Sequence, residues 1–160
     1  MSMKRAPKRR ANRAAVLAAL LMMLPFTRLA GEDALSIYNW RTRVEDAIAH
    51  AEETGRTVLV YFAGSDWCGW CERFHREIVE TDAFQRFLDD ELVPVLIDFP
   101  RRREIDPEQA RYNRELAERL RVSGYPTVIL ISTEGRVLLR TGYIEGGAEA
   151  YIERLQLALE

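Results

Sequence analysis

Residues 67–71 read Trp67-Cys68-Gly69-Trp70-Cys71, and the rest of the chain is best interpreted outward from this stretch. It contains both cysteines of the 160-residue sequence and follows an apolar run at 57–63. That run is β-branched and aromatic, which predicts a buried strand, and the residues after the cysteines show helical spacing. A cysteine at a strand-to-helix turn lies at the helix start. There, free N–H groups and the helix dipole favour a thiolate over a thiol.

The spacing of the two cysteines indicates thiol–disulfide exchange. Cys71 lies one helical turn beyond Cys68, close enough to attack a disulfide that Cys68 has formed. Two buried core cysteines are the simplest alternative. A purely structural disulfide is another, but closing a four-residue loop stabilises by only about 2 kcal/mol. A zinc site would have Cys68, Cys71 and His75, with His50 as the only other histidine and no second cysteine pair, so we expect no metal.

The first 31 residues are typical of a leader segment. Six basic residues precede an apolar run at 14–26, and Leu29-Ala30-Gly31 offers small residues for cleavage. This pattern predicts a secretory signal peptide at 1–31. An uncleaved anchor is the alternative, although the run is shorter than the roughly 20 apolar residues of a membrane span. We therefore expect one domain at 32–160. It should be periplasmic or secreted, in a compartment where disulfides persist. If the leader is retained, the domain should be anchored to the membrane.

The charge of residues 32–160 excludes some partners. They carry 16 basic side chains, all arginine, against 25 acidic ones. A net negative charge argues against nucleic acid as a partner. The basic cluster at 101–103 is expected to be a solvated loop. No glycine-rich phosphate loop or flavin fingerprint is present, so we expect no bound cofactor.

Hydrophobic periodicity predicts the order of the remaining elements. A helix is expected at about 36–53, ended by Thr54-Gly55, before the strand at 57–63. Ser65 or Asp66 is expected to cap the helix that carries Cys71. Further on, the pattern predicts a short helix after Thr81-Asp82, a strand at 92–98, a helix from Asp106-Pro107 to about 121, strands at about 128–131 and 137–139, and a last helix from about 147. Helices between the first strands imply parallel crossovers, and the closing hairpin adds an antiparallel strand.

Several short stretches carry a family resemblance. The most specific are 67–71 and Gly124-Tyr125-Pro126-Thr127, supported by 64–66, 98–100 and Gly142-Tyr143. On these marks the chain from about 34 to 160 resembles thioredoxins, and in particular exported bacterial thioredoxin-like proteins. The resemblance implies an α/β thioredoxin fold: three layers, α/β/α, around a mixed sheet of about four strands. The helix at 36–53 would be an addition at the N-terminus.

The resemblance also implies roles for individual residues. Cys68 would be the exposed nucleophile and Cys71 the shielded resolving thiol. Pro126 would be cis beside the cysteine pair, where the Tyr125 backbone can pair with an extended substrate segment. Of the two tryptophans we expect one to pack against the sheet, and Trp70 to offer an apolar surface to substrate chains. Together the expected substrate contacts are Trp67, Gly69, Trp70, Tyr125 and Pro126.

Two departures from the family pattern bear on the chemistry. Many thioredoxins have a buried aspartate in the strand before the cysteines, which helps to deprotonate the resolving thiol, and Tyr61 occupies that position here. The acid is therefore absent or supplied elsewhere, because Asp66 and Glu72 are close in sequence but expected to be exposed. Gly69-Trp70 contains no histidine between the cysteines, which favours a reductant. His75 is expected only to pack or to form a hydrogen bond.

Together these observations predict an exported thiol–disulfide oxidoreductase that acts on protein disulfides, as a reductant. Its partners would be disulfide-containing proteins and a membrane or soluble electron donor, and we expect a monomer. The alternative is a binding or chaperone module on the same fold, in which the cysteine pair is structural or vestigial.

Overall fold

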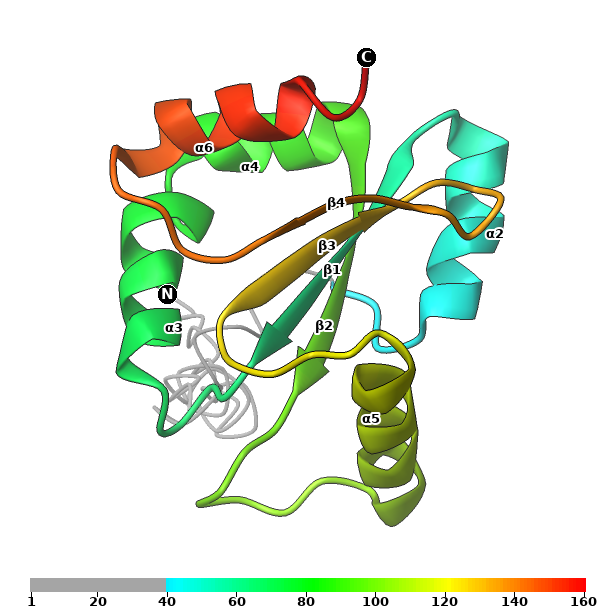
Figure 1. The fold of residues 1–160 in the computed structure, drawn as a ribbon, viewed down its shortest axis with the longest axis vertical. Helices are drawn as coiled ribbons and strands as arrows, with labels where there is room; N and C mark the ends of the chain where they lie inside the picture. Colours follow the sequence, from blue (N-terminus) through cyan, green and yellow to red (C-terminus); the bar gives the residue numbers. More distant parts are fainter. Residues whose placement is uncertain (1–39) are drawn as a thin grey trace, which may run out of the picture. The chain divides into compact units, whose positions relative to one another are not determined.

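The computed structural model describes residues 40–160 (Figure 1). The predicted leader at 1–31 and the first residues of the helix predicted at 36–53 lie outside this range. The described elements, in chain order, are α2 (Val44–Thr54), β1 (Thr57–Ala63), α3 (Gly69–Phe74), the π-helical turn η2 (His75–Val79), α4 (Asp82–Glu91), β2 (Leu92–Asp98), α5 (Pro107–Arg119), β3 (Thr127–Ile131), β4 (Val137–Thr141) and α6 (Gly147–Gln156).

The strands form a four-stranded mixed sheet in the order β2-β1-β3-β4. The crossover from β1 to β2 is parallel, as predicted. The same prediction is wrong for β3, which runs antiparallel to β1. The register gives the reason: Ala63, at the end of β1, pairs with Asp98, at the end of β2, and Phe62 pairs with Thr127, the first residue of β3. The segment that contains α5 stays at the end of the sheet where β1 and β2 finish. The strand β3 therefore starts at that end and runs in the opposite direction.

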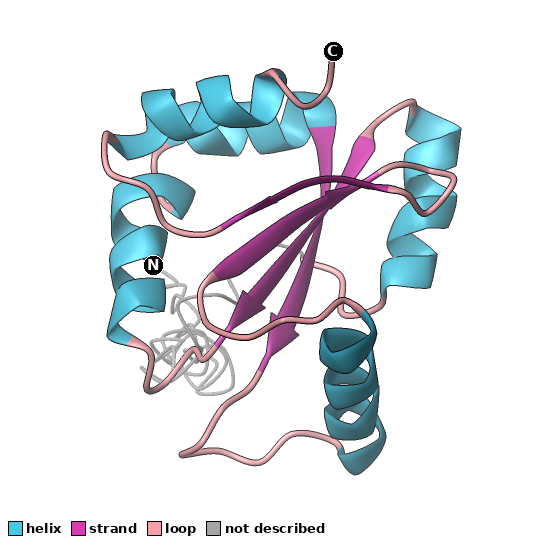
Figure 2. Ribbon diagram, in the orientation of Figure 1, coloured by secondary structure: helices cyan, strands magenta, loops and turns pink. Residues whose placement is uncertain are grey.

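Helices cover both faces of the sheet, which confirms the three-layer prediction (Figure 2). The strand β1 alternates between the two layers, as a period of two requires. Leu59, Tyr61 and Ala63 pack with α3, η2, α4 and α6, while Val58, Val60 and Phe62 pack with α2 and α5. Burial of each valine, leucine or phenylalanine among them stabilises the fold by about 1.5–3 kcal/mol. This double burial fixes the end of β1, from which the active-site turn extends.

The first described helix begins later than predicted. The N–H group of Arg41 donates to the carbonyl of Pro94 at 3.1 Å, and the Leu96 N–H donates to the carbonyl of Arg41 at 2.8 Å. Arg41 therefore pairs with the outer edge of β2, and residues 40–43 are not helical. This edge position also explains how β2 accommodates Pro94, which has no N–H group. The end of α2 at Gly55 is as predicted, with φ of 70°.

Two predicted helix caps are confirmed. The Thr81 hydroxyl accepts a hydrogen bond from the Phe84 N–H at the start of α4. The Asp106 carboxylate accepts from two N–H groups at the start of α5, where Pro107 is the first helical residue. The sequence identified both because a cap acts on residues only two or three positions away. In residues 40–160, no helix has the length and apolarity needed to cross a membrane.

Candidate active site

The two cysteines form a disulfide at the start of α3, with their Cα atoms 5.2 Å apart. They are not equivalent. Cys68 is half-buried, whereas Cys71 is only 4% exposed. The Cys71 N–H group donates to the Cys68 sulfur at 3.1 Å, so the first sulfur receives the N–H at the helix start. When the pair is reduced, the same donor stabilises a Cys68 thiolate.

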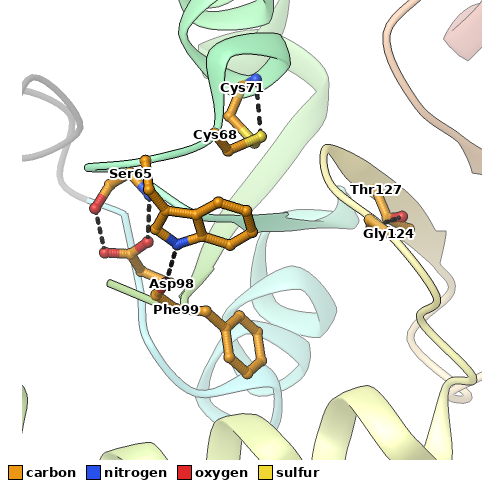
Figure 3. The surroundings of a disulfide bond; sticks show 8 residues. Ser65, Cys68, Cys71, Asp98, Phe99, Gly124 and Thr127 are labelled. Atoms are coloured by element: carbon orange, nitrogen blue, oxygen red, sulfur yellow. Dashed lines mark hydrogen bonds between the residues drawn. A yellow bond between two sulfur atoms is a disulfide. The ribbon is translucent and has the colours of Figure 1, made fainter. Parts of the chain in front are cut away.

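The predicted capping of α3 by Ser65 or Asp66 is wrong, because Cys68 itself is the N-cap. The Ser65 side chain binds the last residue of β2, and the Asp66 side chain binds the segment after it. The Ser65 N–H and hydroxyl donate to the Asp98 carboxylate at 2.9 and 2.6 Å. The Asp66 carboxylate accepts from the N–H groups of Arg101 and Arg102. The turn before the cysteines is therefore held by residues 98–102, and Figure 3 shows the contact between Ser65 and Asp98.

The electrostatics of this attachment follow from its contacts. Asp98 is buried and also accepts a hydrogen bond from Arg103 at 2.6 Å, so its charge is compensated. Asp66 is half-buried instead of exposed as the sequence suggested. Burial alone would raise the pKa of Asp66, but the hydrogen bonds from Arg101 and Arg102 outweigh it and lower the pKa below its usual value. Asp66 is therefore ionised at neutral pH, and its carboxylate holds the turn in place.

Trp67 is the tryptophan that packs. Its indole N–H donates to the Phe99 carbonyl at 2.7 Å (Figure 3). The Tyr125 ring lies edge-on at 5.7 Å, and the Arg101 guanidinium lies 3.6 Å from the ring centroid on a face of the indole. A Cβ atom at Gly64 would come within 3.0 Å of the indole, so this packing requires glycine there. Residues 101–103 form an exposed loop, as expected, and Arg101 additionally contacts the indole of Trp67.

Trp70 has a different environment. Its side chain is 57% exposed, and its ring lies 5.6 Å from that of Tyr143. The Arg73 guanidinium stacks on both rings, and Arg73 and the Tyr143 hydroxyl both donate to Glu77, at 2.9 and 2.6 Å. These two donors, Tyr143 first, lower the pKa of Glu77 below its usual value. The exposed ring of Trp70 thus lies close to the disulfide, and the hydrogen-bonded Arg73 and Tyr143 side chains hold it in position.

The Tyr125–Pro126 peptide bond is cis, as the family resemblance implied. The loop is closed by the Thr127 hydroxyl, which donates to the Gly124 carbonyl at 2.7 Å. A Cβ atom at Gly142 would lie 2.9 Å from the carbonyl oxygen of Pro126, so the chain after β4 can approach this loop only with glycine. The approach brings the neighbour of Gly142, Tyr143, into the same region as the active-site loops.

Within residues 40–160, no group of three or more histidine, cysteine, aspartate or glutamate side chains is arranged to hold a metal ion. His75, the third member of the run considered for zinc, pairs with a carboxylate instead: its Nδ1 lies 3.2 Å from Glu80 Oε1. The expectation that His75 packs and forms a hydrogen bond agrees with this contact and with its burial.

Comparison with known proteins decides the family. Residues 44–157 match the family model of the thioredoxin-like domain. The chain belongs to the thioredoxin-like family. The match includes the cysteine pair, the cis-proline loop and every element of the sheet.

This thioredoxin-like protein is similar to two curated proteins and to a solved structure. It is 31% identical over 157 residues to the disulfide bond reductase DsbH of Chlamydia pneumoniae, covering 91% of this chain and 94% of that protein. The thioredoxin-related protein DsbJ of the same organism is 29% identical over 130 residues, covering 79% of this chain and 37% of DsbJ. A solved structure of a DsbH oxidoreductase superposes with a TM-score of 0.71 at 32% identity, covering 75% and 83% of the two chains. The thioredoxin-like protein is accordingly a thiol–disulfide oxidoreductase.

Sequence reasoning missed several residues of this site. Asp98, Phe99 and Tyr143 were noted only as family marks, yet they hold the turn, the indole of Trp67 and the ring of Trp70, respectively. Arg73 was not singled out. The sequence did contain a signal for the first three, because they lie at or just after the ends of predicted strands. Strand ends that meet at the same end of a sheet bring such residues close together.

Proposed function

We propose that this protein is an exported reductant of protein disulfides, with Cys68 as the nucleophile and Cys71 as the resolving thiol. The observation that carries the proposal is the inequality of the two sulfurs. Cys68 is the more accessible and accepts the N–H at the helix start, while Cys71 is 4% exposed. An attacking thiol needs access and thiolate character, and a resolving thiol needs only to reach the first sulfur.

The proposed reaction has two steps. The Cys68 thiolate attacks one sulfur of a substrate disulfide, which releases the other substrate sulfur as a thiolate and leaves a mixed disulfide. The Cys71 sulfur, after losing its proton, attacks Cys68, releases the second substrate thiolate and forms the Cys68–Cys71 disulfide. Two electrons pass from the cysteine pair to the substrate, so an external electron donor must reduce the pair again.

The substrate would lie across the surface around Cys68. Gly69 leaves room, because nothing lies within 4 Å of where its Cβ would be. The exposed ring of Trp70 offers apolar contact, and the backbone of Tyr125, before Pro126, would pair with an extended substrate segment. Trp67 would act mainly by holding Tyr125 through their edge-on ring contact.

Three observations support the reductant direction and export. The 31% identical relative is a disulfide bond reductase. Gly69-Trp70 has no histidine to stabilise the Cys68 thiolate strongly, and a strongly stabilised thiolate makes an oxidant. The basic and apolar pattern of residues 1–31 supports export, after which a membrane or soluble donor would return the electrons.

The proposal is tested by turnover of a disulfide-containing protein with a chemical reductant as donor. Wild-type protein should reduce the substrate catalytically, and Cys68→Ser should abolish this. Cys71→Ser should form mixed disulfides that accumulate, whereas Cys68→Ser should trap none. The reduction potential, measured against glutathione, should be more reducing than the roughly −180 mV of protein disulfide isomerase.

Equal activity of wild type and Cys68→Ser would contradict the proposal and favour the binding or chaperone module. A potential well above that of glutathione would make the protein an oxidant. Retention of unprocessed protein inside expressing cells would exclude export through residues 1–31.

A further inference from the structure

A cavity of about 250 Å³ lies behind the disulfide, on the side of Cys71. It is lined by Tyr61, Ser65, Cys71, Glu72, His75, Arg76 and Glu80. A water molecule occupies about 30 Å³ in the liquid, so the cavity has room for several. The buried cysteine therefore faces a space that other titratable groups share.

The second step of the proposed reaction requires Cys71 to lose its proton in this setting. Burial disfavours a thiolate, because it removes the charge from water. Tyr61, at the position where many relatives have an aspartate, cannot accept the proton. Burial, and secondarily the charge of Asp98, raises the pKa of the Tyr61 hydroxyl far above its usual value. Tyr61 therefore stays protonated at any pH at which the protein works.

His75 is the buried basic group that faces the same cavity. It lies four residues after Cys71, on the same helix face, and its backbone N–H donates to the Cys71 carbonyl. His75 is only 6% exposed. Cys71 and the His75 imidazole therefore line one space that is large enough for water, which could carry a proton between them.

The π-helical turn η2 orients this imidazole. The Glu80 N–H donates to the His75 carbonyl at 2.9 Å, a bond that spans five residues. The same turn brings the Glu80 carboxylate to 3.2 Å from His75 Nδ1. A carboxylate at Nδ1 fixes the neutral tautomer in which Nδ1 carries the hydrogen and Nε2 has the lone pair. Such π-helical turns are frequently found at functional sites.

We propose that His75 accepts the proton of Cys71, directly or through water in the cavity, and that Glu80 is the positioning residue that orients the imidazole. This inference rests on the proposed function. As the Cys71 S–H bond breaks, its proton passes to Nε2 and its electron pair forms the bond to the Cys68 sulfur. The Cys68–substrate bond breaks, and the substrate leaves as a thiolate. The proton then passes from His75 to solvent through the cavity.

The titration of His75 agrees with this role. Burial lowers its pKa below 6.5 and outweighs Glu80, which acts in the opposite direction. The imidazole is therefore neutral, and able to accept a proton, at neutral pH. The other titratable groups that face it across the cavity are Tyr61 from β1, and Glu72 and Arg76 from its own helical segment.

The test is the decay of a preformed mixed disulfide between Cys68 and a small thiol, followed as a single turnover from about pH 5 to 9. In wild type the rate should rise as His75 loses its proton below pH 6.5 and then stay level. His75→Gln should be roughly 100-fold slower at pH 7, a typical contribution of a positioned proton acceptor. Its rate should keep rising toward pH 9, as for an unassisted buried thiol, whose pKa lies above the free value of about 8.5.

The chain contains a matched control. His50, on the other face of the sheet, contacts Arg56 and Glu53, and His50→Gln should decay as wild type does. Glu80→Gln keeps a hydrogen-bond acceptor but removes the charge that raises the His75 pKa. It should therefore move the rise in rate to lower pH while slowing the level region less than His75→Gln does. Thermal unfolding of each oxidised variant, Glu80→Gln included, checks that a slow rate is not a loss of fold.

The outcomes separate this inference from the proposed function. If wild type reduces substrates and Cys71→Ser traps them, but a folded His75→Gln resolves at the wild-type rate and pH profile, His75 is not the acceptor. Slow decay in Glu72→Gln alone would assign the role to Glu72. If Cys68→Ser turns over as fast as wild type, the proposed function itself fails.

Discussion

The two tryptophans beside the disulfide are three residues apart in sequence, yet they lie in opposite kinds of environment. The Trp67 indole is half-buried and hydrogen-bonded to Phe99, and it contacts Tyr125 and Arg101. The Trp70 side chain is 57% exposed and supported from below by Arg73 and Tyr143. One side of the site is therefore attached to the segment after β2, and the other presents an aromatic surface to solvent.

This difference shows how one short turn serves two purposes. Reduction and oxidation of the pair require Cys68 and Cys71 to keep their relative positions, which the attachment at Trp67 secures. Contact with varied substrate proteins requires apolar area that is available before binding, and Trp70 supplies it. We therefore expect changes on the Trp67 side to alter mainly stability and changes on the Trp70 side to alter mainly substrate use.

The largest expected effect is that of Trp67→Ala. Removing the indole deletes its ring contacts and the hydrogen bond to Phe99, which should lower the free energy of unfolding by about 3 kcal/mol. Trp67→Phe keeps a ring and loses only the hydrogen bond, for a loss of about 1 kcal/mol. Denaturant unfolding of the oxidised proteins measures both. Equal stability of Trp67→Ala and Trp70→Ala would remove the contrast between the two sides.

Substitution of two glycines tests the packing of the Trp67 indole. Gly64→Ala places a Cβ within 3.0 Å of the Trp67 indole and should cost about 2 kcal/mol of stability through overpacking. Gly69→Ala, five residues on, meets nothing within 4 Å and should change stability by less than about 0.5 kcal/mol. The two unfolding midpoints decide the matter. A well-tolerated Gly64→Ala would mean that the indole can move without harm.

Trp70→Ala should sharpen the other half of the comparison. Stability should change by less than about 0.5 kcal/mol, because the side chain is exposed. The KM for a protein disulfide should rise several-fold, as expected from losing about 1 kcal/mol of apolar contact. Reduction of a small disulfide such as oxidised glutathione should be unchanged, since it does not extend over Trp70. An equal loss with both substrates would show that Trp70 acts on the cysteines instead.

The smallest expected effect is a change in the surroundings of Trp70 when Glu77 is protonated at low pH. Because the Tyr143 hydroxyl and Arg73 lower the pKa of Glu77, these contacts persist above the usual value of 4.5 and are lost as pH falls through the lower folded value. The NMR signal of the Trp70 indole should stay constant down to pH 4.5 and shift only below it. Glu77→Gln should give the shifted position already at neutral pH. The same acid transition in both proteins would assign it to another carboxyl group.

The predictions from sequence succeeded where the deciding interactions are local. The caps at Thr81 and Asp106 and the end of α2 at Gly55 each involve partners within a few residues. The strand at 57–63 was evident because both of its faces are apolar, and the cysteine pair because its spacing has a direct chemical meaning. Family resemblance added the cis bond before Pro126, which no local pattern would have indicated.

Tertiary structure decided what sequence could not. Ser65 can cap a helix or bind a distant acid with equal local plausibility, and it binds Asp98, 33 residues away. The same applies to which tryptophan is buried, because Phe99 and Tyr125 reach Trp67 only once β2 and β3 are assembled. The direction of β3 and the extended chain at Arg41 likewise depend on which sheet edge is available. Local pattern thus fixed the elements and the reactive pair, while long-range pairing chose the partners that hold that pair in place.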